Sequence, residues 1–128
     1  MNFKKHYLAA LLAVMLLSET SVARERLPFE GVWAATDREC EDEEGPNTRT
    51  LIATKGTKVG PLFDQYENHC RIMKVQPGSS GYRLSLVCYE FWEDFGKKKG
   101  SRNVTVTLAV QTPQRMIMDG KKYVRCIR

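Results

Sequence analysis

Glu67, His69 and Arg71 alternate along the chain, and alternate residues of a β-strand project from the same face. A carboxylate can serve as a general base, an imidazole as a general acid, and a guanidinium can stabilise charge that develops on a phosphate. A secreted ribonuclease of the microbial type needs these groups. The alternative is that the three polar side chains face solvent while Cys70 and Ile72 point inward. We favour this alternative because small ribonucleases normally bring such groups from several strands.

The segment Glu39–Glu44 concentrates five carboxylates in six residues. Such density attracts a cationic partner or Ca²⁺, but the segment lacks the Asp-x-Asp-x-Asp-Gly order that folds ligands around calcium. We expect a solvated loop without a metal ion, and a cationic partner is the alternative that gives the loop a function. The candidate ligand-binding residues of this loop are Glu41, Asp42, Glu43 and Glu44.

Aromatic residues and carboxylates are mixed from Tyr89 to Phe95, ahead of the Lys97–Lys99 segment. If Phe91 or Trp92 is exposed, the run provides an aromatic platform with an acidic rim, which suits a sugar ring or a basic peptide. Packing of this run in the core at the end of a strand is the alternative. Phe91 and Trp92 are therefore further candidate ligand-binding residues.

Several enzyme motifs are absent from the sequence. There is no Gly-x-Ser-x-Gly, His-Glu-x-x-His or Cys-x-x-Cys, and Gly56–Gly60 is not followed by the Gly-Lys-Ser/Thr of a phosphate loop. We accordingly assign no catalytic residue and no cofactor, with Glu67, His69 and Arg71 kept as the alternative catalytic set.

Residues 1–23 have the pattern of a secretory signal peptide. Lys4 and Lys5 form a positive n-region, Tyr7–Leu17 an apolar h-region, and Ser21–Ala23 a small-x-small cleavage site. The h-region is shorter than the roughly 18 to 20 apolar residues that span a bilayer. We therefore expect cleavage after Ala23 and a periplasmic or secreted bacterial protein with no membrane span.

Residues 24–128 are enough for one domain. The whole chain has 20 Lys and Arg against 15 Asp and Glu, and cleavage removes two Lys and one Glu, which leaves a net charge of +4. A protein that reads nucleic acid usually concentrates basic residues on one face, whereas here they are scattered apart from Lys97–Lys99. A protein or envelope glycan is therefore the expected partner, rather than nucleic acid.

Alternating apolar and polar residues predict the strands. The clearest are 103–111, with Val104, Val106, Leu108 and Val110 on one face, and 82–89, which should point Cys88 into the core. Further strands are predicted at 31–35, with Trp33 in the core, and at 49–54, 67–76, 115–118 and 121–127.

Turn residues separate these strands. Pro77–Gly81 is typical of a hairpin loop, and Asp119–Gly120 favours the type I′ turn of a two-residue hairpin. No segment of the mature chain has a helical apolar period over three turns. We therefore predict an all-β antiparallel meander of six to eight short strands, forming a small barrel or sandwich.

The four cysteines of the mature chain should form two disulfides in an oxidising compartment. We predict consecutive pairing, Cys40–Cys70 and Cys88–Cys126, because each bridge would close a long loop and constrain the unfolded chain. The rival is a Cys70–Cys88 bridge, since a hairpin centred on Ser79 places those two residues opposite each other.

The spacing of several residues resembles that of a known group of proteins. The pattern is Gly31-Val-Trp33, Cys40, Tyr66-Glu67-x-x-Cys70-x-Ile72, Cys88 and Tyr123-Val-Arg-Cys126. It resembles small four-cysteine periplasmic proteins of alphaproteobacteria such as rhizobia. The resemblance implies a periplasmic location and a β fold but no activity, because the group has no established one.

Taken together, these features predict a non-catalytic binding module of the cell envelope. Its most concrete form is a small inhibitor of a cationic enzyme such as lysozyme, since the acidic loop could enter a basic cleft. The net charge of +4 opposes this form because long-range steering would be repulsive. The alternatives are a ribonuclease-like hydrolase and a structural envelope protein without a discrete site.

Overall fold

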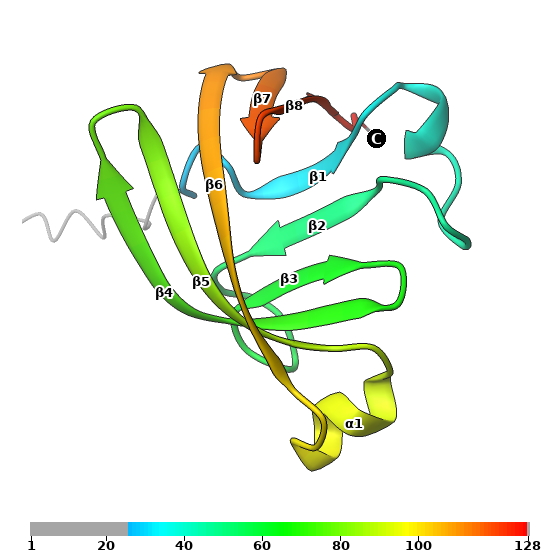
Figure 1. The fold of residues 1–128 in the computed structure, drawn as a ribbon. Coiled ribbons are helices and arrows are strands. Elements are labelled where there is room, and N and C mark those ends of the chain that lie inside the picture. The colour runs from blue at the N-terminus through cyan, green and yellow to red at the C-terminus, as the bar shows by residue number, and fades with distance from the viewer. Residues whose placement is uncertain (1–25, 128) are drawn as a thin grey trace, which may run out of the picture.

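The computed structural model describes residues 26–127, which form a closed barrel of eight antiparallel strands (Figure 1). Each strand pairs with the next along the chain, and β8 pairs back with β1. The predicted all-β antiparallel meander is confirmed, and the barrel is the form it takes. The strands are β1 (Gly31–Ala34), β2 (Thr50–Ala53), β3 (Leu62–Gln65), β4 (Asn68–Gly78), β5 (Gly81–Tyr89), β6 (Arg102–Thr112), β7 (Arg115–Met118) and β8 (Lys121–Arg125).

Two short helices interrupt the meander. A 3-10 helix, η1 (Arg38–Cys40), follows β1, and the helix α1 (Trp92–Lys97) connects β5 to β6. No helix within residues 26–127 is long and apolar enough to cross a membrane. The predicted signal peptide, residues 1–23, lies outside the described residues.

The barrel interior is filled by the inward faces of the strands. Leu84, Leu86 and Cys88 of β5 and Val106 and Leu108 of β6 are buried, as their alternation predicts. In the register of these two strands, Leu84 lies opposite Val106 and Leu86 lies opposite Val104. Successive side chains of a strand point to opposite faces of the sheet. The buried residues of β5 and β6 therefore point into the barrel, where they contribute to the core, and the residues between them face outward.

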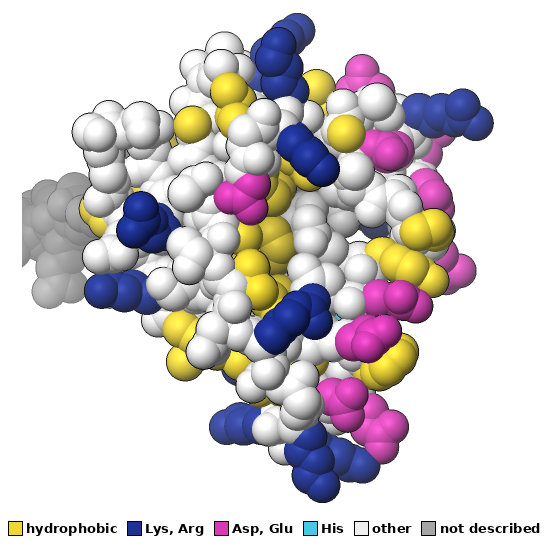
Figure 2. All heavy atoms as spheres, in the orientation of Figure 1, with side chains coloured by type: hydrophobic (Ala, Val, Ile, Leu, Met, Phe, Trp, Pro, Cys, Tyr) yellow, Lys and Arg dark blue, Asp and Glu magenta, His cyan; other side chains and the backbone are white. Residues whose placement is uncertain are grey.

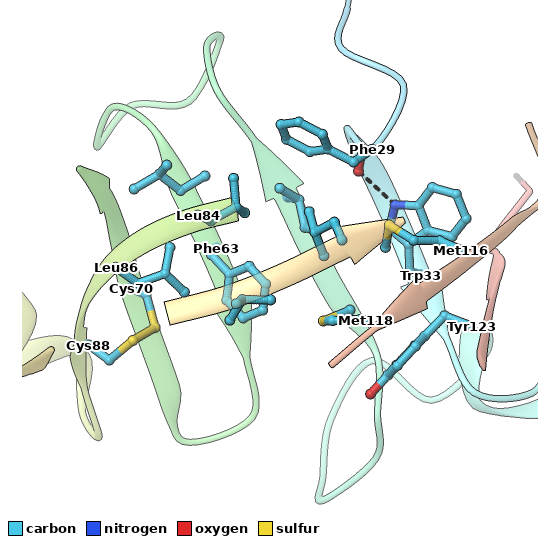
Figure 3. Close-up of a cluster of buried hydrophobic side chains, with 14 residues drawn as sticks. Phe29, Trp33, Phe63, Cys70, Leu84, Leu86, Cys88, Met116, Met118 and Tyr123 are labelled. Atoms are coloured by element: carbon cyan, nitrogen blue, oxygen red, sulfur yellow. Dashed lines mark hydrogen bonds between the residues drawn. A yellow bond between two sulfur atoms is a disulfide. The ribbon is translucent and has the colours of Figure 1, made fainter. Parts of the chain in front are cut away.

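Trp33 is fully buried, as predicted, and it anchors one end of the core (Figure 3). Its indole Nε1–H donates to the carbonyl oxygen of Phe29 at 2.8 Å, which satisfies the one polar atom that burial would otherwise leave unpaired. Trp33 therefore fixes the segment that leads into β1.

The two predicted hairpins are present, with small differences. Asp119 and Gly120 have φ angles of +48° and +79°, which fit the predicted type I′ turn between β7 and β8. The β4–β5 hairpin extends to Gly78 and Gly81, so its turn is Ser79–Ser80 and is tighter than the predicted loop.

One strand, β3, was not predicted from the sequence. It has only four residues, Leu62–Gln65, which is too short for an alternating pattern to stand out. A related difference is that β4 begins at Asn68, whereas Glu67 lies in the β3–β4 turn with a φ of +47°. Glu67 is therefore not a strand residue.

The predicted consecutive pairing of the cysteines is wrong, and the disulfides are Cys40–Cys126 and Cys70–Cys88. The β4–β5 register places Cys70 directly opposite Cys88, with their Cα atoms 4.0 Å apart, inside the barrel (Figure 3). Closure of the barrel brings the residues that follow β1 and β8 together, and there the Cα atoms of Cys40 and Cys126 are 5.4 Å apart. Strand pairing thus decides the partners, and loop length does not.

Arg125 holds the seam between β1 and β8. Its guanidinium lies 4.3 Å from the centre of the Trp33 ring and donates to the carbonyl oxygens of Glu30 at 2.7 Å, Pro28 at 2.9 Å and Pro113 at 2.6 Å. A Cβ atom on Gly31 would lie 2.4 Å from one guanidinium nitrogen, so glycine is required for this close approach.

Glu30 binds the other side of the same segment. Its carboxylate accepts hydrogen bonds from the Leu27 amide at 2.7 Å and from the amide and hydroxyl of Thr54 at 2.7 and 2.5 Å. Burial by itself raises the pKa of Glu30, but these bonds and the charge of Lys55 outweigh it, so the pKa lies below its ordinary value of 4.5. The segment before β1 is therefore held by a carboxylate that must stay ionised.

The lowered pKa of Glu30 predicts a loss of stability in acid. A carboxyl whose pKa is lower in the folded protein contributes stability above its ordinary value of 4.5, and this contribution disappears as the pH falls through the folded-state pKa. Urea unfolding measured over a pH series should show a smaller acid-dependent loss in Glu30→Gln than in the unmodified protein. Equal slopes in the two proteins would contradict the assignment, and Glu93→Gln, on the exposed face of α1, is the matched control.

Candidate functional site

A row of cross-strand neighbours crosses the outer face of β1 to β4. Val32 pairs with Leu51, Leu51 with Asp64, and Asp64 with His69. On each strand at least one neighbour of these residues is buried in the barrel, namely Trp33, Thr50, Ile52, Phe63 and Cys70, so this row faces outward. It is apolar on β1 and β2 and ionisable on β3 and β4.

Connections between the strands lie next to this row of residues. The loop that follows η1 carries Glu43 and Glu44, and the junction between β5 and α1 carries Glu90, Phe91 and Trp92. The β3–β4 turn carries Tyr66 and Glu67. Figure 2 shows carboxylates interspersed with hydrophobic side chains down this side of the molecule, where Figure 1 places the loop after η1, the β3–β4 turn and α1.

The row and the loops enclose a hollow of about 520 Å³, which we call the acidic hollow. Its size is within the range of about 300 to 1,000 Å³ that is usual for ligand sites. The lining residues are Val32, Glu43, Glu44, Gly45, Asn47, Arg49, Leu51, Asp64, Gln65, Tyr66, Glu67, His69, Glu90, Phe91 and Trp92.

Negative charge dominates the acidic hollow. Five of its lining residues are carboxylates, and Arg49 is the one Arg or Lys among them. The guanidinium of Arg49 lies 3.7 Å from a Glu43 oxygen. Within residues 26–127, the carboxylates of Glu44, Glu67 and Glu90 have no hydrogen-bond or ion-pair partner. The hollow therefore favours a cation over an anion.

Three side chains of the lining, Asp64, His69 and Trp92, contact one another in series. A carboxylate oxygen of Asp64 lies 2.5 Å from Nδ1 of His69, and because a carboxylate only accepts, Nδ1 carries the proton. The imidazole stacks on the Trp92 indole, with ring centres 4.1 Å apart and planes inclined by 21°. Asp64 thus orients His69, and His69 supports Trp92.

The aromatic residues between 89 and 95 divide between two environments. Tyr89 and Phe95 are buried in a small cluster with Leu62 beneath α1, on the outside of the barrel. Phe91 and Trp92 are 53% and 47% exposed and line the hollow. From the sequence, an exposed aromatic platform and packing in the core are alternatives for this run. In the structure, Phe91 and Trp92 are exposed, whereas Tyr89 and Phe95 are buried.

Among the alternative catalytic residues, Glu67 and His69 both line the acidic hollow, but Arg71 does not. The Arg71 guanidinium donates to the carbonyl oxygens of Phe95 at 3.1 Å and Val59 at 3.3 Å, and it lies 3.9 Å from the centre of the Phe95 ring. Arg71 therefore fastens α1 and the 54–61 loop to β4.

The acidic loop is likewise divided. Glu43 and Glu44 line the hollow, whereas Glu41 and Asp42 do not. Glu39 accepts a hydrogen bond from the Thr48 hydroxyl at 2.5 Å, which helps to fix the loop against the barrel. Residues 43–47 thus turn one edge of the loop toward the hollow, and residues 41–42 remain on its outer side.

Sequence reasoning missed Asp64 and Tyr66 as site residues. Asp64 belongs to β3, and without that strand nothing placed it opposite His69, whereas Tyr66 was noted only as part of the Tyr66-Glu67-x-x-Cys70 pattern. The usable signal was the short run Leu62–Phe63 between the turn residues Gly60–Pro61 and the polar segment that follows.

Metal-ligating residues or a second hollow could also provide a functional site. Within residues 26–127, no group of three His, Cys, Asp or Glu side chains is arranged to hold a metal ion. A second hollow, of about 430 Å³, lies at the β4–β5 hairpin and has Arg83 as its one charged lining residue.

No protein-family model, curated protein or solved structure matches the chain. The fold and the site therefore define its class by themselves. It is a disulfide-bonded, eight-stranded β-barrel with an acidic hollow, rimmed by aromatic residues, on its outer face.

The contacts of Arg71 predict a structural role for this residue. Arg71→Lys removes the stacking on Phe95 and at least one of the two hydrogen bonds, and we expect it to lower the free energy of unfolding by about 1 to 3 kcal/mol. Urea unfolding checks this, with the exposed Arg83→Lys as the matched control. A loss in Arg71→Lys no greater than in the control would show that the guanidinium does not hold α1.

Proposed function

We propose that this protein is a non-catalytic binding module of the cell envelope that holds a cationic group of a partner protein in its acidic hollow. The observation that carries the proposal is the joint presence of excess carboxylates and exposed aromatic rings in one concave site. Hydrophobic rings give contact area, and carboxylates give selectivity for positive charge.

The distribution of exposed hydrophobic side chains supports this choice of surface. Six large hydrophobic residues among those described are exposed, and three of them, Tyr66, Phe91 and Trp92, line the hollow. Single exposed hydrophobic residues need no explanation, but a group at one concave site marks an interaction surface.

The concrete form of the proposal is an inhibitor of a cationic enzyme such as lysozyme. After cleavage of the predicted signal peptide the chain has a net charge of +4, so its approach to a cationic protein is repulsive at long range. The affinity must therefore come from contacts within the hollow, where the local charge has the opposite sign. This favours an exposed basic segment of the partner over a broad electrostatic interface.

The proposed location outside the cytoplasm rests on chemistry of the same chain. All four cysteines are paired in disulfides, and disulfides persist in oxidising compartments such as the periplasm. This agrees with the signal peptide predicted at residues 1–23. The resemblance to four-cysteine periplasmic proteins of alphaproteobacteria is part of the same proposal.

Neutralising carboxylates inside and outside the hollow should separate a specific site from general charge. We expect the double variant Glu44→Gln, Glu90→Gln to weaken binding of a cationic probe about tenfold, since each exposed ion pair contributes up to about 1 kcal/mol. The control Glu41→Gln, Asp42→Asn removes the same charge outside the hollow and should change affinity less than about twofold. Calorimetric titration with a cationic lysozyme and with the peptide acetyl-Gly-Lys-Arg-Gly-amide provides the measurement.

The possible results of this titration have distinct meanings. Binding of the peptide without lysozyme would support the cation site and contradict the lysozyme-inhibitor form. Equal losses in the two double variants would mean that the hollow is not the site. Binding of neither probe would contradict the proposal and leave a structural envelope protein without a discrete site.

A ribonuclease-like hydrolase is the second candidate, and one observation favours it. A carboxylate that orients an imidazole, as Asp64 does for His69, is a common arrangement for acid–base chemistry, and Glu67 lines the same hollow. If this reaction occurs, residues 24–128 should cleave RNA, and His69→Ala should lower the rate by about 10² or more. The absence of cleavage at micromolar protein would exclude this candidate.

A further inference from the structure

The Trp92 indole is held in a defined plane at the rim of the acidic hollow. His69 stacks on it in nearly parallel orientation at 4.1 Å, and Phe95 meets it edge to face, with ring centres 5.0 Å apart. The His69 side chain is only 12% exposed and is fixed by Asp64, so it forms a firm support. Trp92 nevertheless remains 47% exposed, which leaves much of the ring available for contact.

Carboxylates line the same hollow as this ring. Glu44, Glu67 and Glu90 line the hollow together with Trp92, and all three are exposed and have no partner within residues 26–127. A planar cation that stacks on the indole would therefore lie in the same hollow as carboxylates that are free to accept its N–H groups.

This arrangement discriminates between the two basic side chains of proteins. A guanidinium is planar and weakly hydrated, stacks on aromatic faces, and donates in its plane to carboxylates. A lysine ammonium is a compact, strongly hydrated point charge, and it gains less from an exposed ring. In an open hollow, contacts with the protein replace only part of the water around an ammonium, so they compensate poorly for the free energy of hydration that the ammonium loses.

Two arginines of the chain itself are bound in this manner. The Arg71 guanidinium lies 3.9 Å from the centre of the Phe95 ring and that of Arg125 lies 4.3 Å from Trp33, and both also donate hydrogen bonds to main-chain carbonyl oxygens. Stacking combined with in-plane donation is thus a stable way to hold a guanidinium on this barrel.

We infer that the acidic hollow selects guanidinium over ammonium, so that its occupant is an arginine side chain on an exposed segment of the partner protein, stacked on Trp92. This inference rests on the proposed function and specifies its ligand. The excess of carboxylates favours binding of a cation, and the Trp92 indole, stacked on His69, favours a planar cation. Asp64 and His69 act as positioning residues, because they hold the ring and are not required to touch the ligand.

Three matched probes test the selection. Acetyl-arginine amide and acetyl-lysine amide have the same charge, and acetyl-citrulline amide has nearly the shape of the arginine probe without the charge. The chain has two tryptophans, so an NMR titration can follow two indole N–H signals, with Trp92→Phe used to assign them. We expect the Trp92 signal to shift with arginine at an affinity about fivefold higher than with lysine, and not with citrulline. The buried Trp33 signal should not move.

Variants of Trp92 and His69 test the mechanism. Trp92→Leu should abolish the preference for arginine while leaving weak binding of both cations, and Trp92→Phe should retain part of the preference. These two are followed by calorimetry, as they lack the indole. His69→Ala should reduce the preference, and His69→Phe, which restores a ring beneath Trp92, should recover it. A preference unchanged in both Trp92→Leu and His69→Ala would overturn the stacking model.

The outcomes separate this inference from the proposed function. Equal affinity for arginine and lysine would overturn the selection of guanidinium and leave the cation site standing. Binding of citrulline as strong as that of arginine would overturn both, because charge would then play no part. If none of the probes binds, the cation site itself is wrong.

Discussion

The pairing of β1 with β8 is the contact on which the rest of the barrel depends, because it turns an open meander into a closed sheet without edges. Strand pairing there is short, only two residue pairs, so it is reinforced by other interactions. Arg125 donates to two carbonyl oxygens of the segment before β1 and to a third in the β6–β7 turn, and the Cys40–Cys126 disulfide joins the segments that follow β1 and β8. That disulfide spans 86 residues, and in the chain-entropy model a bridge of such length stabilises the fold by about 4 to 5 kcal/mol.

Closure of the barrel also determines what its outer face can do. Side chains that fill the interior leave their neighbours along each strand pointing outward, and at β1 to β4 these neighbours form the floor of the acidic hollow. The connections supply the walls, since the loop after η1 is tied to the seam through Cys40 and α1 is fastened to β4 through Arg71. The site therefore combines a floor of β-strand residues with walls of loops and a short helix, and two of these walls are fastened to the barrel at a defined residue.

Much of the fold followed from the sequence because β-strands with one buried face leave an alternating pattern. The strands β5 and β6 are long enough for that pattern to be unambiguous, and the Asp119–Gly120 pair marked its hairpin through a backbone conformation that few residues adopt. The strand β3 is too short to show alternation, and its omission hid Asp64 from the candidate site. The disulfide prediction was wrong because it weighed loop entropy, whereas proximity in the folded sheet decides which thiols can bond.

By itself, the sequence determined the class of fold, the burial of Trp33 and the residue types available for chemistry, because these depend on local patterns of polarity and on turn residues. The tertiary structure alone decided which of those residues meet. Glu43, His69 and Trp92 are far apart in the chain and share one hollow, whereas Arg71, two residues from His69, is bound to α1 instead. The physical reason is that strand register and barrel closure set distances between segments, and neither leaves a signal in the composition of any one of them.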